Sequence, residues 1–113
     1  MGKYQLRDIE AAVCFRFGTD LDELRSPRRS RTYTRPRYYI FLLAREFTSL
    51  SLPQIGNRYD RDHTTVMHGI KRIKELYPLS PRVRRHVSEI CGILENSPTA
   101  REQMRASVQK GEF

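Results

Sequence analysis

The feature that most constrains the fold of this chain is the recurrence of apolar residues at the spacing of an α-helix. Between residues 62 and 77, four of them stand at positions i, i+4, i+7 and i+11: Val66, Ile70, Ile73 and Tyr77. The same spacing recurs in three further sets: Leu6, Ile9, Val13 and Phe17; Tyr39, Leu42, Leu43 and Phe47; and Val83, Val87, Ile90 and Leu94. No segment alternates apolar and polar residues as a half-buried strand does. The sequence therefore predicts an all-α protein, a helical bundle with one core.

Start and stop signals divide this pattern into six expected helices, at residues 5–17, 20–24, 34–50, 51–59, 62–77 and 83–94. Gly18 is a natural stop for the first helix, and Asp20 can cap the second. We expect Pro36 in the first turn of the third helix, where its missing N–H costs no hydrogen bond. Ser51, followed three residues later by Gln54, forms a capping box for the fourth.

The length and the charge indicate one basic domain. A chain of 113 residues suits a single domain, which we place at residues 1–96, with a C-terminal tail or linker at 97–113. The segment 25–37, "RSPRRSRTYTRPR", holds six arginines and no acid, and we interpret it as an exposed basic loop. The net charge of +8 and the pI near 10.0 favour a polyanionic partner, above all double-stranded DNA.

Other classes of protein are disfavoured by what the sequence lacks. It has no apolar run long enough to span a bilayer and no signal-peptide pattern, so we expect a cytoplasmic protein without a membrane partner. Cys14 and Cys91 lie within apolar-periodic stretches, which favours buried thiols over a disulfide.

The spacing of the candidate residues argues against a catalytic site or a metal site. The phosphate-binding pattern GxxxxGK[ST] is absent. His63 and His68 are five residues apart, so one helix places them on different faces and they do not share a metal. Asp62, His63 and Thr64 are consecutive and therefore do not converge as a triad. We expect no enzyme activity, no catalytic residue, no metal, no cofactor and no small-molecule substrate.

The segment 51–77 has the pattern of a helix-turn-helix: a short helix, a tight turn at Asp60–Arg61, and a longer second helix. In that motif the first residues of the second helix enter the major groove of DNA. These residues are Asp62, His63, Thr64 and Thr65, whose short donors and acceptors suit contacts with base edges. The alternative is that Asp62 only caps the helix and the threonines only fill its first turn.

Basic residues surround this motif and are candidates for phosphate contacts. Those predicted from charge and position are Arg28, Arg31, Arg35, Arg37, Arg45, Lys71 and Arg72. Arginines of the basic loop also suit a narrow minor groove. The alternative is that these charges form an ordinary solvated face.

The stretches "SLPQIG" and "RDHTTVMHG" carry a family resemblance. With the flanking sequence from about Leu6 to Leu94, they resemble the C-terminal DNA-binding domain (domain IV) of the bacterial replication initiator DnaA. The resemblance implies that this domain binds short asymmetric DNA boxes. It places Arg29 in the minor groove and assigns the major-groove contacts to Asp62, His63, Thr64 and Thr65. It assigns contacts at or beside phosphates to Arg37, Arg45, Pro53, His68 and Arg72.

The sequence departs from the family in three respects. The turn before the second helix reads "YDRDHTT" where the family has "FGGRDHTT", so it is one residue shorter and lacks glycine. Pro27 stands where the family often has a lysine. The ATPase that DnaA initiators join to this domain is absent, so we do not expect this chain by itself to initiate replication.

These observations predict sequence-specific binding of double-stranded DNA by a nucleoid-associated protein of bacteria or phage, with a role in transcription regulation. One alternative is a competitor or modulator of the replication initiator at its boxes. Another is a docking module that recruits a polymerase or replication protein through the region after Pro78. The chain could also be a fragment of a longer regulator.

Overall fold

The structure, a computed structural model, describes residues 4–96. These residues form six helices and no strand, which confirms the predicted all-α class. The helices are α1 (Leu6–Phe17), α2 (Leu21–Arg25), α3 (Arg31–Phe47), α4 (Leu52–Arg58), α5 (His63–Leu76) and α6 (Pro81–Glu95). The predicted tail or linker at 97–113 lies outside the described residues, and the proposed domain limit at residue 96 stays a prediction.

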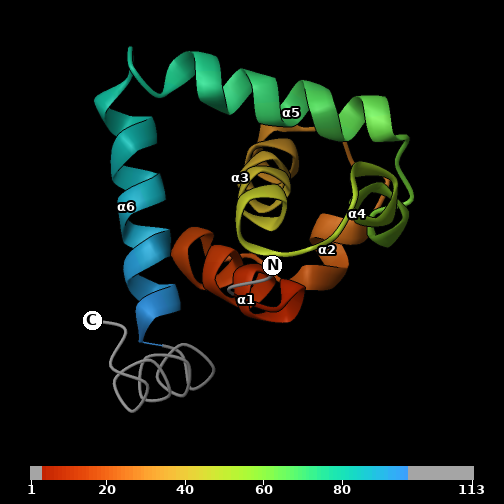
Figure 1. Ribbon diagram of the computed structural model, residues 1–113, viewed down its shortest axis with the longest axis horizontal. Coiled ribbons are helices and arrows are strands. Elements are labelled where there is room, and N and C mark those ends of the chain that lie inside the picture. The colour runs from red at the N-terminus through yellow and green to blue at the C-terminus, as the bar shows by residue number, and fades with distance from the viewer. Residues whose placement is uncertain (1–3, 97–113) are drawn as a thin grey trace.

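Helix α3 is the centre of the molecule. Figure 1 shows it nearly end-on, with the other helices arranged around it. It packs against α5 and α1, while α4 packs on α5, and α6 packs on α1. Eight of its residues are buried, among them Ile40 and Ala44, which are fully covered. The apolar stripe of α5 meets this helix through Val66, Ile70 and Ile73, which are all buried. The core therefore forms where these three residues predicted it, but Tyr77, the fourth residue of the stripe, is wrong as a core residue because it is 44% exposed after the end of α5.

The predicted caps are confirmed. Gly18 ends α1 with φ 65°, a left-handed conformation that glycine adopts without steric cost. The Asp20 side chain accepts a hydrogen bond from Glu23 N and caps α2. Ser51 and Gln54 form both halves of the capping box at α4.

The predicted start of α3 is wrong. The helix begins at Arg31 instead of Thr34, and Pro36 lies inside it rather than in its first turn. Ser30 initiates the helix, because its carbonyl accepts from Tyr33 N and Thr34 N, both at 3.0 Å. Pro36 then removes a single helical hydrogen bond further along. The basic segment 25–37 is therefore largely helical, and the loop proper is confined to residues 26–30.

A buried charged network ties the helix-turn-helix to the N-terminal helices. Glu10 of α1 is 4% exposed, and its Oε2 accepts from the Tyr59 hydroxyl at 2.7 Å. Arg25 Nη2 donates to both carboxylate oxygens of Glu10, at 3.0 and 3.3 Å. Burial, together with the Glu10 carboxylate, raises the pKa of Tyr59 far above its usual range, so the hydroxyl stays a donor.

Cys14 and Cys91 are partly buried and form no disulfide with each other, and burial raises the pKa of the Cys14 thiol. Thus the expected thiols are present, but they are less deeply buried than predicted.

Within residues 4–96, no helix has the length and apolar character needed to cross a membrane.

Gly56 provides a test of the packing of the helix-turn-helix. A Cβ added at Gly56 would lie 2.5 Å from the backbone oxygen of Arg61, whereas one at Gly92 would meet nothing within 4 Å. Gly56→Ala should therefore lower the free energy of unfolding by about 1–3 kcal/mol through overpacking. Gly92→Ala, the matched control within α6, should raise it by up to about 1 kcal/mol because alanine favours the helix. Urea unfolding of both variants measures the difference. Equal effects would contradict the close contact between α4 and the turn.

Candidate nucleic-acid interface

The basic loop at 26–30 is held in place by the buried side chain of Arg37. This side chain is 3% exposed and donates to three backbone carbonyls. Nε donates to Leu24 O at 2.6 Å, Nη1 to Arg28 O at 2.6 Å, and Nη2 to Ser26 O at 2.8 Å. The phosphate contact predicted at Arg37 stays a prediction, which this geometry disfavours because the guanidinium is occupied inside the protein. Its role is to shape the loop that presents Arg29.

Arg61 joins this loop to the turn of the helix-turn-helix. Its guanidinium donates to Tyr59 O within the turn and to Ser26 O at 2.8 Å. The Ser26 carbonyl thus accepts from both Arg37 and Arg61. Burial and the neighbouring Arg61 charge lower the pKa of Arg37. The local sequence indicates only that Arg61 belongs to a polar turn, and no local pattern signals a contact with a residue 35 positions away.

The shortened turn closes without glycine. Asp60 adopts φ 51°, and it is the one non-glycine residue with positive φ within the described part of the chain. Aspartate tolerates this left-handed conformation better than most residues. Arg61 N donates to Gly56 O at 2.9 Å and completes the turn. The turn that departs from the family pattern is therefore a closed, hydrogen-bonded structure.

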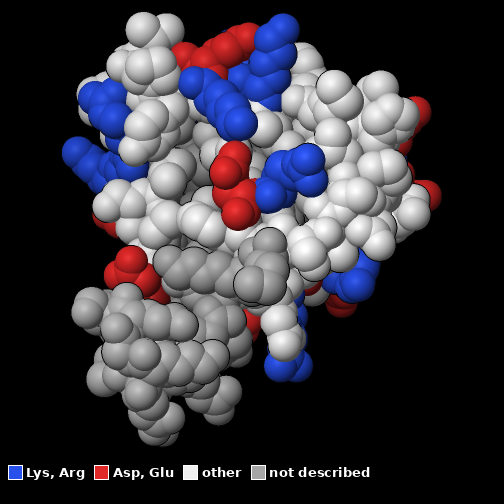
Figure 2. Space-filling view, viewed as in Figure 1, with Lys and Arg blue, Asp and Glu red and all other residues white. Residues whose placement is uncertain are grey.

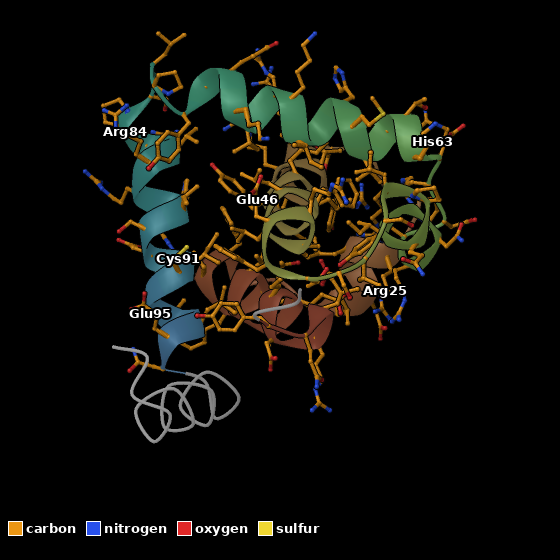
Figure 3. The ribbon with its side chains drawn as sticks, viewed as in Figure 1. Arg25, Glu46, His63, Arg84, Cys91 and Glu95 are labelled. Carbon is orange, nitrogen blue, oxygen red and sulfur yellow. The ribbon has the colours of Figure 1, made fainter. Side chains whose placement is uncertain are left out.

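The first residues of α5 are exposed at the end of the helix, and Figure 3 shows His63 pointing away from the bundle. Asp62 Oδ1 accepts from Thr64 N at 3.1 Å, so Asp62 is an N-cap. This hydrogen bond is the main reason that the pKa of Asp62 is lowered. Because the cap uses one oxygen and the side chain is 65% exposed, the carboxylate can also accept from a base.

His63 is oriented by the same carboxylate. Its Nδ1 lies 2.9 Å from Asp62 Oδ1, and its side chain is 52% exposed. The second ring nitrogen, Nε2, has no hydrogen-bond partner among the described residues and can meet a base edge as donor or acceptor, according to its protonation. Asp62 therefore serves as cap and as the group that fixes the ring of His63.

The remaining predicted DNA contacts, those of Arg29 in the minor groove and of the phosphate-contacting residues, fall into four groups. Arg28 and Arg29 are exposed on the loop, and the Arg28 guanidinium donates to the Tyr33 hydroxyl at 2.7 Å. Arg31, Arg35 and Arg72 line one hollow of the surface, between α3, α5 and α6. Arg45 and Lys71 line another, beside Met67. The exposed Pro53 and His68 complete the predicted set. Their contacts with DNA stay predictions.

Charge is not spread evenly over the molecule. Figure 2 shows basic and acidic side chains interleaved on the face in view, next to a broad uncharged area. On α5, Lys71 Nζ lies 3.9 Å from Glu75 Oε1, and Lys74 Nζ lies 3.5 Å from Glu46 Oε1. These lysines are thus partly neutralised within the protein. The arginines of the loop and of the hollow between α3, α5 and α6 are the stronger candidates for phosphate contacts.

Comparison with known proteins gives one consistent result. A family model described as "Bacterial dnaA protein helix-turn-helix" matches residues 6–73. The chain is 45% identical over 75 residues to the chromosomal replication initiator protein DnaA of Roseobacter denitrificans, which covers 66% of this chain and 16% of that protein. It is 37% identical over 94 residues to the same protein of a Ruegeria species and 38% over 92 residues to that of Rickettsia bellii. Those alignments cover 82% and 80% of this chain, and 20% of each relative. The chain thus spans a fifth or less of the length of these relatives.

Proposed function

The chain belongs to the DnaA helix-turn-helix family, and from this premise we propose that it binds double-stranded DNA in a sequence-specific manner. The observation that carries the proposal is the exposed start of α5, where Asp62 orients the ring of His63 beside Thr64 and Thr65. Donors and acceptors at the first turn of the second helix of a helix-turn-helix are what base reading requires.

The proposed complex uses two grooves. Asp62, His63, Thr64 and Thr65 contact base edges in the major groove, and Arg29 enters the adjacent minor groove. Arg29 follows directly on Arg28, whose carbonyl is held by Arg37, and the loop is joined to the turn through Arg61. This internal connection supports simultaneous contact with both grooves, because it fixes the loop relative to α5. Exposed arginines on the flanks contact phosphates and set affinity and register, whereas the base contacts set specificity.

We assign the protein a regulatory role at its DNA sites, as a transcription regulator associated with the nucleoid in the cytoplasm. The relatives described above are named chromosomal replication initiator proteins. Competition with an initiator for shared boxes is the alternative on the same surface. The altered turn at Asp60 favours a separate target, since it changes the connection that leads into the base-reading residues.

A second candidate function is protein docking through the region after Pro78. Leu79 is 79% exposed and lies beside Tyr77, which is also exposed, at the corner between α5 and α6. Exposed apolar side chains of this kind suit a protein partner. Weak, sequence-blind DNA binding together with a stable complex with a polymerase or replication protein would favour this function over base reading.

His63→Ala and Lys71→Ala separate base reading from phosphate binding. His63→Ala should weaken binding to the preferred box by about 1–3 kcal/mol, roughly 5- to 150-fold, and leave binding to a scrambled duplex unchanged. Lys71→Ala should weaken binding to both duplexes by a similar factor. Fluorescence anisotropy with the two duplexes measures each affinity. If His63→Ala weakened both equally, His63 would not be a base-reading residue.

A further inference from the structure

The hollow between α3, α5 and α6 has the composition of an anion site. It has a volume of about 600 Å³, and four arginines line it: Arg31, Arg35, Arg72 and Arg82. Thr34, Tyr38 and Ser80 also line it, and no aspartate or glutamate does. Guanidinium groups are the side chains best suited to phosphate oxygens, to which they donate two hydrogen bonds at a time.

The charge of these arginines is not balanced inside the protein. Among the ion pairs of residues 4–96, none involves any of the four. The nearby carboxylate of Glu89 is paired with Arg16 at 2.5 Å. His86 lines the same hollow, and burial and the surrounding arginines lower its pKa, which favours its neutral form. Four like charges around one hollow repel each other unless an anion binds among them.

The hollow is continuous with the base-reading surface. Thr65, His68 and Arg72 follow each other at helical spacing on one face of α5. Tyr38 of α3 packs against this face, with its ring 6.4 Å from that of His68, and it also lines the hollow. Nine residues separate His63 from Arg72, which is about 14 Å along the helix axis. This length is close to the roughly 12 Å width of the major groove, so Arg72 lies where the groove ends and the phosphates begin.

Arg82 brings α6 into this surface. The corner between α5 and α6 is fixed by Arg84, whose Nη1 donates to Tyr77 O at 2.8 Å and to Pro78 O at 3.0 Å (Figure 3). Arg82 is therefore held at a defined position relative to α5. The family match ends at residue 73, so this arginine lies outside the matched helix-turn-helix.

We propose that the arginine hollow binds backbone phosphates of the duplex beyond the box, with Arg82 of α6 as a contact from outside the helix-turn-helix. This inference rests on the proposed function and lengthens the stretch of DNA that the protein is proposed to contact. Sequences flanking the box then contribute to affinity without being read. One phosphate contact at 0.1 M salt contributes about 8-fold to affinity through counterion release, since 0.1 M raised to the power −0.9 is about 8.

The test compares Arg82→Ala with Arg85→Ala, which removes the same charge from an exposed position of the same helix that does not line the hollow. Affinity is measured against salt on two duplexes, one limited to the box and one with ten flanking base pairs on each side. Arg82→Ala should weaken binding to the longer duplex by up to about 8-fold and flatten its salt slope by about 0.9. Arg82→Ala should leave the affinity for the short duplex unchanged. Arg85→Ala should change neither the affinity nor the salt slope on either duplex.

Equal behaviour of the two variants would overturn the inference while leaving the proposed function intact. Failure of the wild-type chain to prefer any duplex would instead overturn the proposed function. In that case, titration with inorganic phosphate, followed by the NMR signals of the His86 ring, shows whether the hollow holds free anions. A shift in the wild type that Arg82→Ala abolishes would reassign the hollow to free phosphate and would overturn its assignment to duplex phosphates. Thermal unfolding confirms that both variants fold.

Discussion

Replacing Arg37 with methionine should destabilise the protein by about 2–6 kcal/mol, because the carbonyls of Leu24 and Arg28 lose their donor, each at a cost of about 1–3 kcal/mol. The Arg37 side chain fills a buried site and donates to the carbonyls of Leu24, Ser26 and Arg28. Methionine fills much of the volume but donates no hydrogen bond, so carbonyls beneath the loop lose their partner. Since a domain of this size has a total stability of about 5–15 kcal/mol, the loss is a large part of it.

The same substitution should also weaken DNA binding, because the loop that presents Arg29 loses its internal support. Arg45→Met is the matched control: it lies on the same helix and is exposed. We expect Arg45→Met to change stability by less than about 0.5 kcal/mol. Chemical unfolding measures both variants. If Arg37→Met were as stable as Arg45→Met, the guanidinium would not be the group that orders the loop.

Raising the salt concentration from 50 to 200 mM should lower affinity for a duplex that contains the box and its flanking base pairs about 500-fold. This value assumes that five phosphates are neutralised, at Arg31, Arg35, Arg45, Lys71 and Arg72, which gives a slope of log K against log[salt] of about −4.5. A sixth contact at Arg82 steepens the slope to about −5.4. All five side chains are exposed, and no aspartate or glutamate lines the hollow that holds Arg31, Arg35 and Arg72, whereas Lys71 has to exchange its contact with Glu75 for a phosphate.

Arginine substitutions in the hollow give this prediction a second check. Combining Arg31→Ala with Arg35→Ala should flatten the slope by about 1.8, because each phosphate contact contributes about 0.9. Titrations over a range of salt concentrations measure the slopes directly. A wild-type slope shallower than about −2 would mean that phosphate contacts are not a main source of affinity. A steep slope that the double variant leaves unchanged would place the contacts elsewhere.

Much of the fold could be predicted because its determinants are local. Apolar stripes at helical spacing place Val66, Ile70 and Ile73 in the core, and all three are buried. The caps at Asp20 and Ser51 depend on residues three positions away, so a short window of sequence contains all the information needed.

The predictions that the structure does not support concern Arg37, whose hydrogen-bond partners are distant in the sequence, and Pro36, which takes an unusual position inside a helix. Arginines are rarely buried, so a run of six arginines predicts an exposed loop, and nothing nearby signals that Arg37 turns inward. Its three acceptors lie 9 to 13 residues earlier in the chain. Proline usually marks a first turn, which led to a helix start at Thr34, whereas Ser30 initiates the helix and Pro36 is accommodated inside it.

The candidate site likewise combines features that the local sequence predicts with features that depend on residues distant in the sequence. The cap role of Asp62 follows from its position before the helix, and the structure confirms it. The link from Arg61 to Ser26 and the hollow that includes Arg82 depend on the packing of separate helices, which the sequence pattern does not reveal. The assignments of Arg29 and of Asp62 to Thr65 rested on the family resemblance together with residue chemistry, and they stay predictions until a complex is tested.

The most direct test of the central claim is a selection of preferred duplexes from a random pool, with the wild-type chain and His63→Ala in parallel. We expect the wild type to enrich a short asymmetric box and the variant to lose preference at one base of it. A box shared with a replication initiator would favour competition, and a distinct box would favour a dedicated regulator. No enrichment with either protein, at a salt concentration where both bind, would contradict sequence-specific DNA reading by this helix-turn-helix.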